Sequence, residues 1–142
     1  MFVPGNHETQ ESADAIAKHY NVKNLDGDYI RIDDVGFFGA GGANMMLNYV
    51  SDKDLYDNLK KGYEKIKDAK KKIMVTHVPP AGTAFEKFFV PGSGSKAITR
   101  AIEKFQPDIH ICGHIHEMEG FEEKIGKTRV ISVGSRGRII DI

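Results

Sequence analysis

The feature that most constrains this chain is the alternation of short apolar runs with segments whose apolar residues recur at helical spacing. Runs with the length of buried strands lie at residues 35–39, 73–75 and 109–112. The intervening segments carry apolar stripes formed by Leu55, Leu59, Tyr63 and Ile66, and by Ile98, Ala101, Ile102 and Phe105. Strands that alternate with helices form a helix-covered sheet, so the pattern predicts a mixed α/β sandwich.

Local signals place several further elements. Apolar residues on one face predict a helix over residues 10–20. Ser51 and Asp54 have the spacing of a capping box, which opens a second helix. Residues 29–32 are expected to form a strand that turns directly into the run at residues 35–39.

The remaining stretches have weaker signals. Pro79 and Pro80 exclude a helix directly after the central apolar run, so we expect a long loop that extends to about residue 92. Residues 44–50 are ambiguous. Short antiparallel strands, with a turn near Gly126, are expected at residues 120–124, 128–133 and 138–142.

Length and charge limit the classes of function. No linker, repeat or low-complexity segment divides the 142 residues, so residues 1–142 are predicted to form a single domain. Lys and Arg total 20, as do Asp and Glu, so no bulk positive field would attract nucleic acid. This balance argues against a nucleic-acid partner without excluding one, and leaves a small phosphorylated substrate open.

The single cysteine and the lack of long apolar runs indicate where in the cell the protein is found. Cys112 excludes an internal disulfide and fits a reducing compartment. No apolar run approaches the length of a membrane span, and nothing resembles a signal peptide. We therefore expect a cytoplasmic protein without a membrane partner.

Three short histidine-bearing motifs follow apolar runs in a fixed order. They are Gly5-Asn6-His7-Glu8, Thr76-His77 and Gly113-His114-Ile115-His116. Each lies where an apolar run stops, so each would place imidazoles at the mouth of a sheet. Neutral imidazole binds zinc, iron, nickel and related cations, and two histidines one residue apart can share a site or reach adjacent cations. The ordered set indicates a metal-dependent hydrolase.

Other polar residues of the motifs add to this chemistry. Asn6 offers an amide oxygen, which is a hard neutral ligand for a divalent cation. His7 points elsewhere and can carry a proton. Glu8 and Glu117 could orient the ligands, although a solvated position on the surface explains each equally well.

Several residues have a structural explanation that we favour over a role in a site. His19, late on the first helix, is a favourable charge near the helix C-terminus. His110 alternates with apolar neighbours, which indicates a core histidine, so we reject Asp108-x-His110 as a metal motif. Cys112 is expected to be inert core.

The turn at residues 92–95 could cradle a phosphate with its backbone amides. An ordinary helix cap by Ser93 or Ser95 is the favoured alternative.

Taken together, the motifs resemble the calcineurin-like metallophosphoesterase superfamily, whose ordered blocks are Asp-x-His, Gly-Asp-x-x-Asp, Gly-Asn-His-Asp/Glu, a lone His and Gly-His-x-His. The last three blocks match residues 5–8, His77 and residues 113–116. Similarity extends through His77-Val78-Pro79-Pro80-Ala81-Gly82-Thr83 and Gly94-Ser95-Lys96-Ala97-Ile98. The likeness is to the small prokaryotic phosphoesterases related to cyclic-nucleotide phosphodiesterases.

The resemblance implies two divalent cations (Mn, Zn, Fe or Ni) at the mouth of the sheet. Asn6, His77 and His114 would bind one cation and His116 the other, while His7 would be the catalytic acid or transition-state stabiliser. The implied reaction is hydrolysis of phosphomonoesters or phosphodiesters by a metal-activated hydroxide. The implied fold is an α/β/β/α sandwich with mixed sheets.

The first two blocks of the family are absent, and this departure sets further expectations. We expect a C-terminal portion of a longer phosphoesterase, a partial sandwich that lacks the N-terminal strands, with an incomplete active site that holds one cation or none. An exposed apolar sheet face would favour a homo-oligomer or a partner that supplies the missing half. The alternatives are a non-catalytic metal- or phosphate-binding remnant, an assembly subunit of a split phosphoesterase, and an α/β domain with structural histidines.

Overall fold

The structure is a computed structural model that describes residues 1–43 and 48–142, except for the side chains of Phe85 and Phe89. The strands are β1 Tyr29–Ile32, β2 Val35–Ala40, β3 Lys71–Thr76, β4 Ile109–Cys112, β5 Glu122–Ile125 and β6 Thr128–Ser132. The helices are α1 Gln10–Tyr20, α2 Asp52–Ile66, α3 Ala84–Phe89 and α4 Lys96–Phe105, with a short 3-10 helix, η1 His116–Met118.

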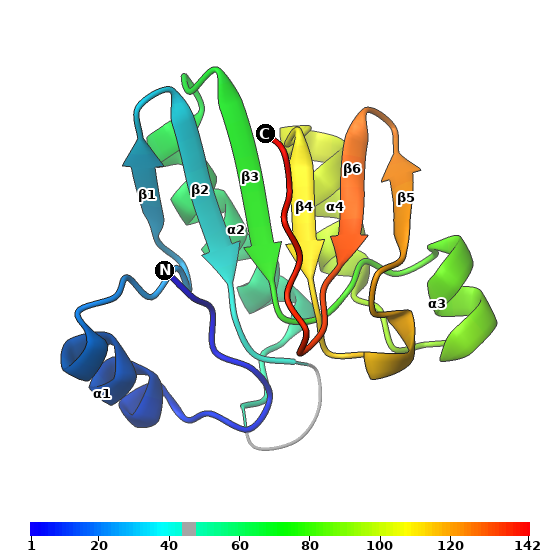
Figure 1. The fold of residues 1–142 in the computed structure, drawn as a ribbon, viewed down its shortest axis with the longest axis horizontal. Coiled ribbons are helices and arrows are strands. Elements are labelled where there is room, and N and C mark those ends of the chain that lie inside the picture. The colour runs from blue at the N-terminus through cyan, green and yellow to red at the C-terminus, as the bar shows by residue number, and fades with distance from the viewer. Residues whose placement is uncertain (44–47) are drawn as a thin grey trace.

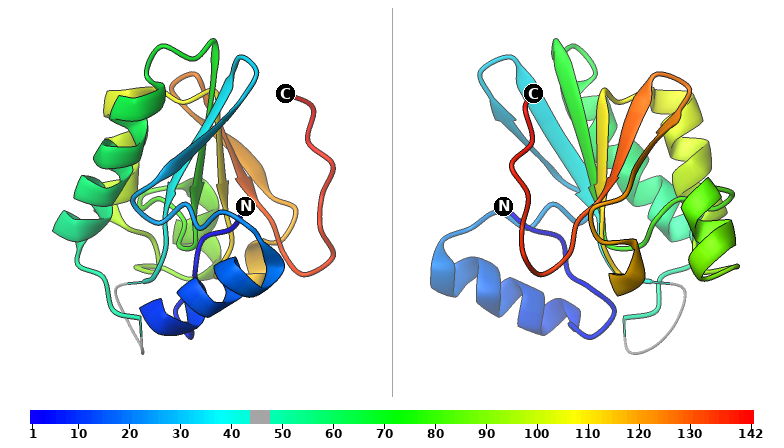
Figure 2. Two further views of the ribbon diagram at one scale, coloured as in Figure 1. Left: turned by 90° about the vertical axis from the view of Figure 1, so that its left-hand side faces the viewer. Right: turned by 45° about the vertical axis from the view of Figure 1, so that its right-hand side comes forward.

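The strands described form one mixed sheet of six strands in the order β1-β2-β3-β4-β6-β5 (Figure 1). The four central strands run parallel, and the edge strands β1 and β5 are antiparallel to their neighbours. Helices α2 and α4 cover one face of the sheet, and the C-terminal tail crosses the other (Figure 2). The predicted mixed α/β class is confirmed. Within the described ranges, no helix is long and apolar enough to cross a membrane.

Side-chain caps fix where the helices begin. In each of the four α-helices, a hydroxyl oxygen accepts the backbone N–H three residues further on; the capping residues are Thr9, Ser51, Thr83 and Ser95. The predicted start of α2 at Ser51 is confirmed. At the start of α4, Ser95 is the capping residue.

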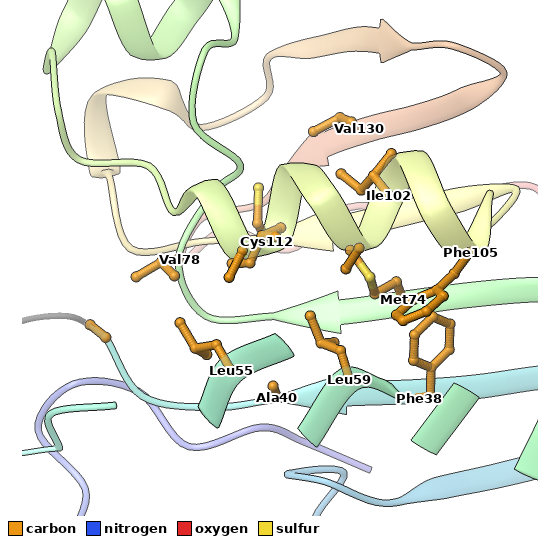
Figure 3. Close-up of a cluster of buried hydrophobic side chains, with 14 of the residues drawn as sticks. Phe38, Ala40, Leu55, Leu59, Met74, Val78, Ile102, Phe105, Cys112 and Val130 are labelled. Atoms are coloured by element: carbon orange, nitrogen blue, oxygen red, sulfur yellow. The ribbon is translucent and has the colours of Figure 1, made fainter. Parts of the chain in front are cut away.

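The main core lies between the sheet and helices α2 and α4 (Figure 3). Leu59 of α2 and Ile102 of α4 are fully buried, as are Phe38 and Met74 on the facing strands. Burial of such side chains stabilises the fold by roughly 1.5–3 kcal/mol each. The apolar stripes therefore hold the two helices against the sheet, and this packing fixes the strand ends that carry the histidines.

The opposite sheet face carries a smaller apolar cluster around Ile73, Ile109 and Ile131. Partly buried side chains surround these three; they are Val35, Phe37, Val75, Ile111, Val133 and Ile140. Ile140 belongs to the tail, which Arg138 anchors by donating hydrogen bonds to the Gly120 carbonyl (3.2 Å) and to Glu122 Oε2 (2.8 Å). Val3 and Leu25 also lie against this face at Gly39, where an added Cβ would be 2.9 Å from Val3 Cγ1 and 3.2 Å from Leu25 Cβ. Among the described residues, the tail and these N-terminal segments cover the face.

Two expectations were wrong. The stretch expected to be a long loop contains α3 at Ala84–Phe89, which begins at a Thr83 cap and contains the buried Glu86. Residues 138–142 form no strand, because the tail crosses a sheet face, where the strands have no free backbone groups to pair. The ambiguous segment at residues 44–50 lies partly outside the described residues, since residues 44–47 are not described.

Candidate metal centre

The histidines that follow β3 and β4 lie at the same edge of the sheet. These strands are parallel neighbours with Ile73 opposite Ile109, so the chain leaves both strands at one end. His77 follows β3 directly, and His114 follows β4 after Gly113. The Gly113 N–H donates to the His77 carbonyl at 2.9 Å, which ties the two turns together.

Asn6 reaches this edge from the N-terminal segment. Asn48 donates its backbone N–H to the Asn6 carbonyl (3.1 Å) and its side-chain amide to the Gly5 carbonyl (2.9 Å). A Cβ at Gly41 would lie only 2.4 Å from Pro4 Cγ, so the segment passes this loop at a distance that only glycine allows. These contacts hold Asn6 in place through its backbone and leave its side chain for the site.

Three donor atoms converge at this edge. His77 Nε2 lies 2.7 Å from Asn6 Oδ1 and 3.0 Å from His114 Nδ1. The two imidazole rings are 4.9 Å apart and inclined at 69°. Asn6 is only 6% exposed, and both rings are partly buried. The structure therefore brings together three of the predicted ligands, which lie in three distant segments of the chain.

The geometry and the protonation of these groups fit a divalent cation. Atoms bonded to one cation at about 2.1 Å lie about 3.0–3.4 Å apart at octahedral or tetrahedral angles. The observed separations of 2.7 and 3.0 Å are close to this range. Burial, followed by the neighbouring His114, lowers the pKa of His77 to about 4, and burial also lowers the pKa of His114. Both rings are therefore neutral at pH 7, as metal binding requires.

The donor set contains no carboxylate. Within residues 1–43 and 48–142, no group of three or more His, Cys, Asp or Glu side chains is placed to hold a metal ion. The cluster depends on the amide oxygen of Asn6 as its third donor. Three neutral donors supply no charge to offset that of a cation, so binding by these groups alone would be weaker than in a site with carboxylates.

His114 also has an uncommon backbone conformation. Its φ is 69°, in the left-handed region that non-glycine residues rarely adopt. Such a conformation costs on the order of 1–3 kcal/mol and tends to occur at functional sites. Here it accompanies the placement of the His114 ring beside His77.

His7 and His116 lie near the cluster without joining it. Both are exposed, and η1 begins at His116. Positive charge on either residue lowers the pKa of His114, which indicates their proximity. Among the described residues, neither ring hydrogen-bonds to Asn6, His77 or His114, so their predicted roles rest on the sequence.

Glu8 supports the first motif. Its Oε2 accepts the Gly5 N–H at 2.6 Å. A Cβ on Gly5 would lie 2.8 Å from this oxygen and 3.1 Å from His77 Cε1, so the carboxylate and the ring both pack against the Gly5 backbone. This placement favours an orienting role for Glu8, whereas Glu117 is exposed.

Sequence reasoning missed Asn48, whose hydrogen bonds hold the backbone of Gly5 and Asn6. An asparagine in a loop carries no signal of its distant partners.

Three residues interpreted as structural are confirmed in that role. His110 is fully buried with Nε2 2.8 Å from Thr76 Oγ1, and burial lowers its pKa to about 3. Burial raises the pKa of the Cys112 thiol to about 12, as expected for inert core. Asp108 accepts the backbone N–H of Lys72 at 2.8 Å, which is a structural contact between strands.

The turn before α4 already contains an anionic group. Glu86 accepts backbone N–H groups from Gly92 (2.7 Å) and Gly94 (3.4 Å) at Oε1, and from Gly82 (3.1 Å) at Oε2. These amides are therefore occupied by a buried carboxylate, and Ser95 caps the helix. The capping alternative is confirmed, and the phosphate cradle is not formed.

Comparison with known proteins identifies relatives. The chain is 32% identical over 141 residues to the uncharacterized protein MJ1162 of Methanocaldococcus jannaschii, covering 93% of this chain and 62% of that protein. It is 27% identical over 100 residues to the UPF0046 protein K07C11.7 of Caenorhabditis elegans, covering 70% of this chain and 33% of that protein. The chain thus spans about three-fifths or less of the length of these relatives.

A solved structure has a similar fold. TT1561 of Thermus thermophilus superposes with a TM-score of 0.66 at 18% identity, over 92% of this chain and 60% of that one. Residues 1–118, which include Asn6, His77 and His114, match the model of a protein family, calcineurin-like phosphoesterase. The protein therefore belongs to the calcineurin-like phosphoesterase family.

Proposed function

We propose that this protein is a metal-dependent phosphoesterase that hydrolyses phosphomonoesters or phosphodiesters. The observation that carries the proposal is the convergence of Asn6 Oδ1, His77 Nε2 and His114 Nδ1 in a chain of this family. Neutral imidazoles and an amide oxygen suit Mn, Zn, Fe or Ni. The net charge of zero gives no bulk positive field that would attract nucleic acid, so we expect a small phosphorylated molecule of the cytoplasm as the substrate.

The proposed roles divide between the cation and the protein. When bound, divalent cations would polarise the phosphoryl oxygens and activate a water molecule for attack on phosphorus. Asn6, His77 and His114 would hold one cation, and His116 is the proposed ligand of a second. His7, which is exposed beside Asn6, would donate a proton to the leaving alkoxide.

Hydrolysis of aryl phosphate monoesters and diesters, measured with added Mn²⁺ or Zn²⁺, tests this proposal. We expect His114→Ala or Asn6→Ala to lower kcat/KM at least about 100-fold, because loss of a direct ligand should exceed the effect of losing an outer hydrogen bond. The matched control is His19→Ala, on the exposed surface of α1, which should retain activity. Absence of turnover with any divalent ion, in protein that folds normally, would reject an enzymatic role for this chain.

The lack of a carboxylate in the cluster favours a second candidate, a chain that binds one cation or a phosphate without turnover. A pair of adjacent cations needs anionic ligands to offset their repulsion, and no described Asp or Glu joins the imidazoles in a metal-binding group. Metal analysis distinguishes the candidates. Tight binding of one cation per chain without hydrolysis would favour this one, and unchanged thermal stability with metal or chelator would indicate structural histidines.

A further inference from the structure

A cavity lies between helices α2 and α4, apart from the histidine cluster. It has a volume of about 440 Å³, within the range of small-molecule sites. Lys53, Tyr56 and Asp57 line it from α2, and Lys96 and Arg100 line it from α4. None of the proposed metal ligands borders this cavity.

Arg100 differs from the other arginines of the chain. The others, Arg31, Arg129, Arg136 and Arg138, each form an ion pair with a carboxylate. Arg100 instead lies over the ring of Tyr56, with the guanidinium carbon 4.5 Å from the ring centroid. In the described part of the chain, no carboxylate lies within ion-pair distance of it.

The contact with the Tyr56 ring restrains Arg100 for binding. A guanidinium that lies on a ring keeps its N–H donors in its own plane, where a ligand's oxygens can reach them. The Tyr56 ring is itself held in place, because it packs on the Phe105 ring with 5.6 Å between the ring centroids. Phe105 in turn stacks on Tyr63, with 4.5 Å between their centroids. Binding would therefore lose little side-chain freedom at Arg100.

The charges around the cavity favour an anion. Lys96 lies one helical turn before Arg100, so the two cations share a face of α4. Of the two lining carboxylates, Asp57 pairs with Lys53 at 3.1 Å, and Asp52 accepts a hydrogen bond from Ser95 Oγ at 2.6 Å. Three cations and two carboxylates leave the lining with a net charge of +1.

We propose that this cavity is a binding site for a small phosphate-bearing anion, held by Arg100 and Lys96. A guanidinium fork beside an ammonium point charge suits the several oxygens of a phosphoryl group. The site does not depend on the proposed phosphoesterase activity, since it uses no residue of the histidine cluster.

Titration of the full chain with inorganic phosphate tests the proposal. The protein is ¹⁵N-labelled and treated with chelator, ionic strength is held constant, and backbone amide shifts are followed. We expect saturable shifts at residues 52–57 and 96–100, and a loss of affinity of about tenfold in Arg100→Gln. Lys96→Gln should weaken binding several-fold. Arg31→Gln removes an arginine that is paired with Asp68 and should leave binding unchanged.

Three results would overturn the proposal. The first is a set of shifts centred on residues 5–8, 77 and 113–116 that disappears in His114→Ala. The second is a response that does not saturate or that Arg100→Gln leaves unchanged, which would indicate non-specific screening. The third is the absence of any shift. If Arg100→Gln loses amide dispersion, Lys96→Gln provides the test, and unchanged affinity in that variant would also reject the site.

Discussion

Buried histidines contribute to how this protein responds to acid. His110 is completely buried, and burial lowers its pKa to about 3, against 6.5 for an exposed histidine. The unfolded chain therefore binds a proton between these pH values that the folded chain does not. It follows that the free energy of unfolding falls as pH decreases through this window, by up to about 1.4 kcal/mol per pH unit. At pH 7 the ring is neutral in the folded state and mostly neutral in the unfolded state.

Replacing His110 by Leu should flatten this dependence. Leu does not titrate, and Thr76 Oγ1 would keep its hydrogen bond to the Val78 carbonyl (2.7 Å), so no donor is orphaned. Urea unfolding at pH 7, 5.5 and 4.5 would measure the slope. Some dependence should remain, because the pKa of His77 is also lowered, to about 4. His19→Leu, at an exposed position, should retain the full slope, and an equal slope in His110→Leu would contradict the prediction.

Individual residues of the site could be predicted from the sequence where the end of a strand determines their position. His77 and His114 follow the parallel neighbours β3 and β4, which deliver the following residues to one edge. Asn6 follows no named strand, because Phe2 forms only an isolated bridge with Asn24, and its grouping with the two histidines came from the family resemblance. The same rule does not separate these three from His7 and His116, because the direction of a side chain after a strand depends on the turn. The left-handed conformation of His114 is one such detail.

Elements were predictable where their signals are local. The expected boundaries of α1, β1 and β4 match the structure, and α2 begins at the predicted cap, because apolar spacing, caps and turns lie within each segment. The failures have tertiary causes. Helix α3 is tied to the next turn by Glu86, whose partners lie as far along the chain as Gly94. The tail contacts the sheet through single side chains such as Ile140.

Glu86 is accordingly predicted to stabilise α3 and the turn before α4 together. Its side chain is 5% exposed, and its carboxylate accepts three backbone N–H groups. Glu86→Gln would turn an amide N–H₂ toward these donors and should lower the free energy of unfolding by about 2 kcal/mol. Chemical denaturation would measure this loss. Glu103→Gln, on the exposed surface of α4, should stay within about 0.5 kcal/mol of the parent protein, and a similarly small effect of Glu86→Gln would contradict the prediction.

At the scale of the whole molecule, the two faces of the sheet are unequal. One face packs on α2 and α4 and buries the main core. The other carries partly buried apolar side chains, including Phe37, Val75 and Ile111. The C-terminal tail crosses this face (Figure 2). Apolar surface of this kind is favourably covered by another molecule. We therefore predict that the chain forms a homo-oligomer through this face, with a different partner chain as the alternative occupant.

The native mass at micromolar concentration, measured by light scattering after gel filtration, tests this association. The double variant Val75→Thr with Ile111→Thr keeps β-branched residues in the strands while making the face polar, so it should remain folded and become monomeric. Ile139→Thr is the matched control, because Ile139 is 94% exposed and lies outside the apolar cluster. A parent protein that is already monomeric would contradict the prediction. Oligomers that survive in the folded double variant would place the interface on another surface, such as the edges formed by β1 and β5.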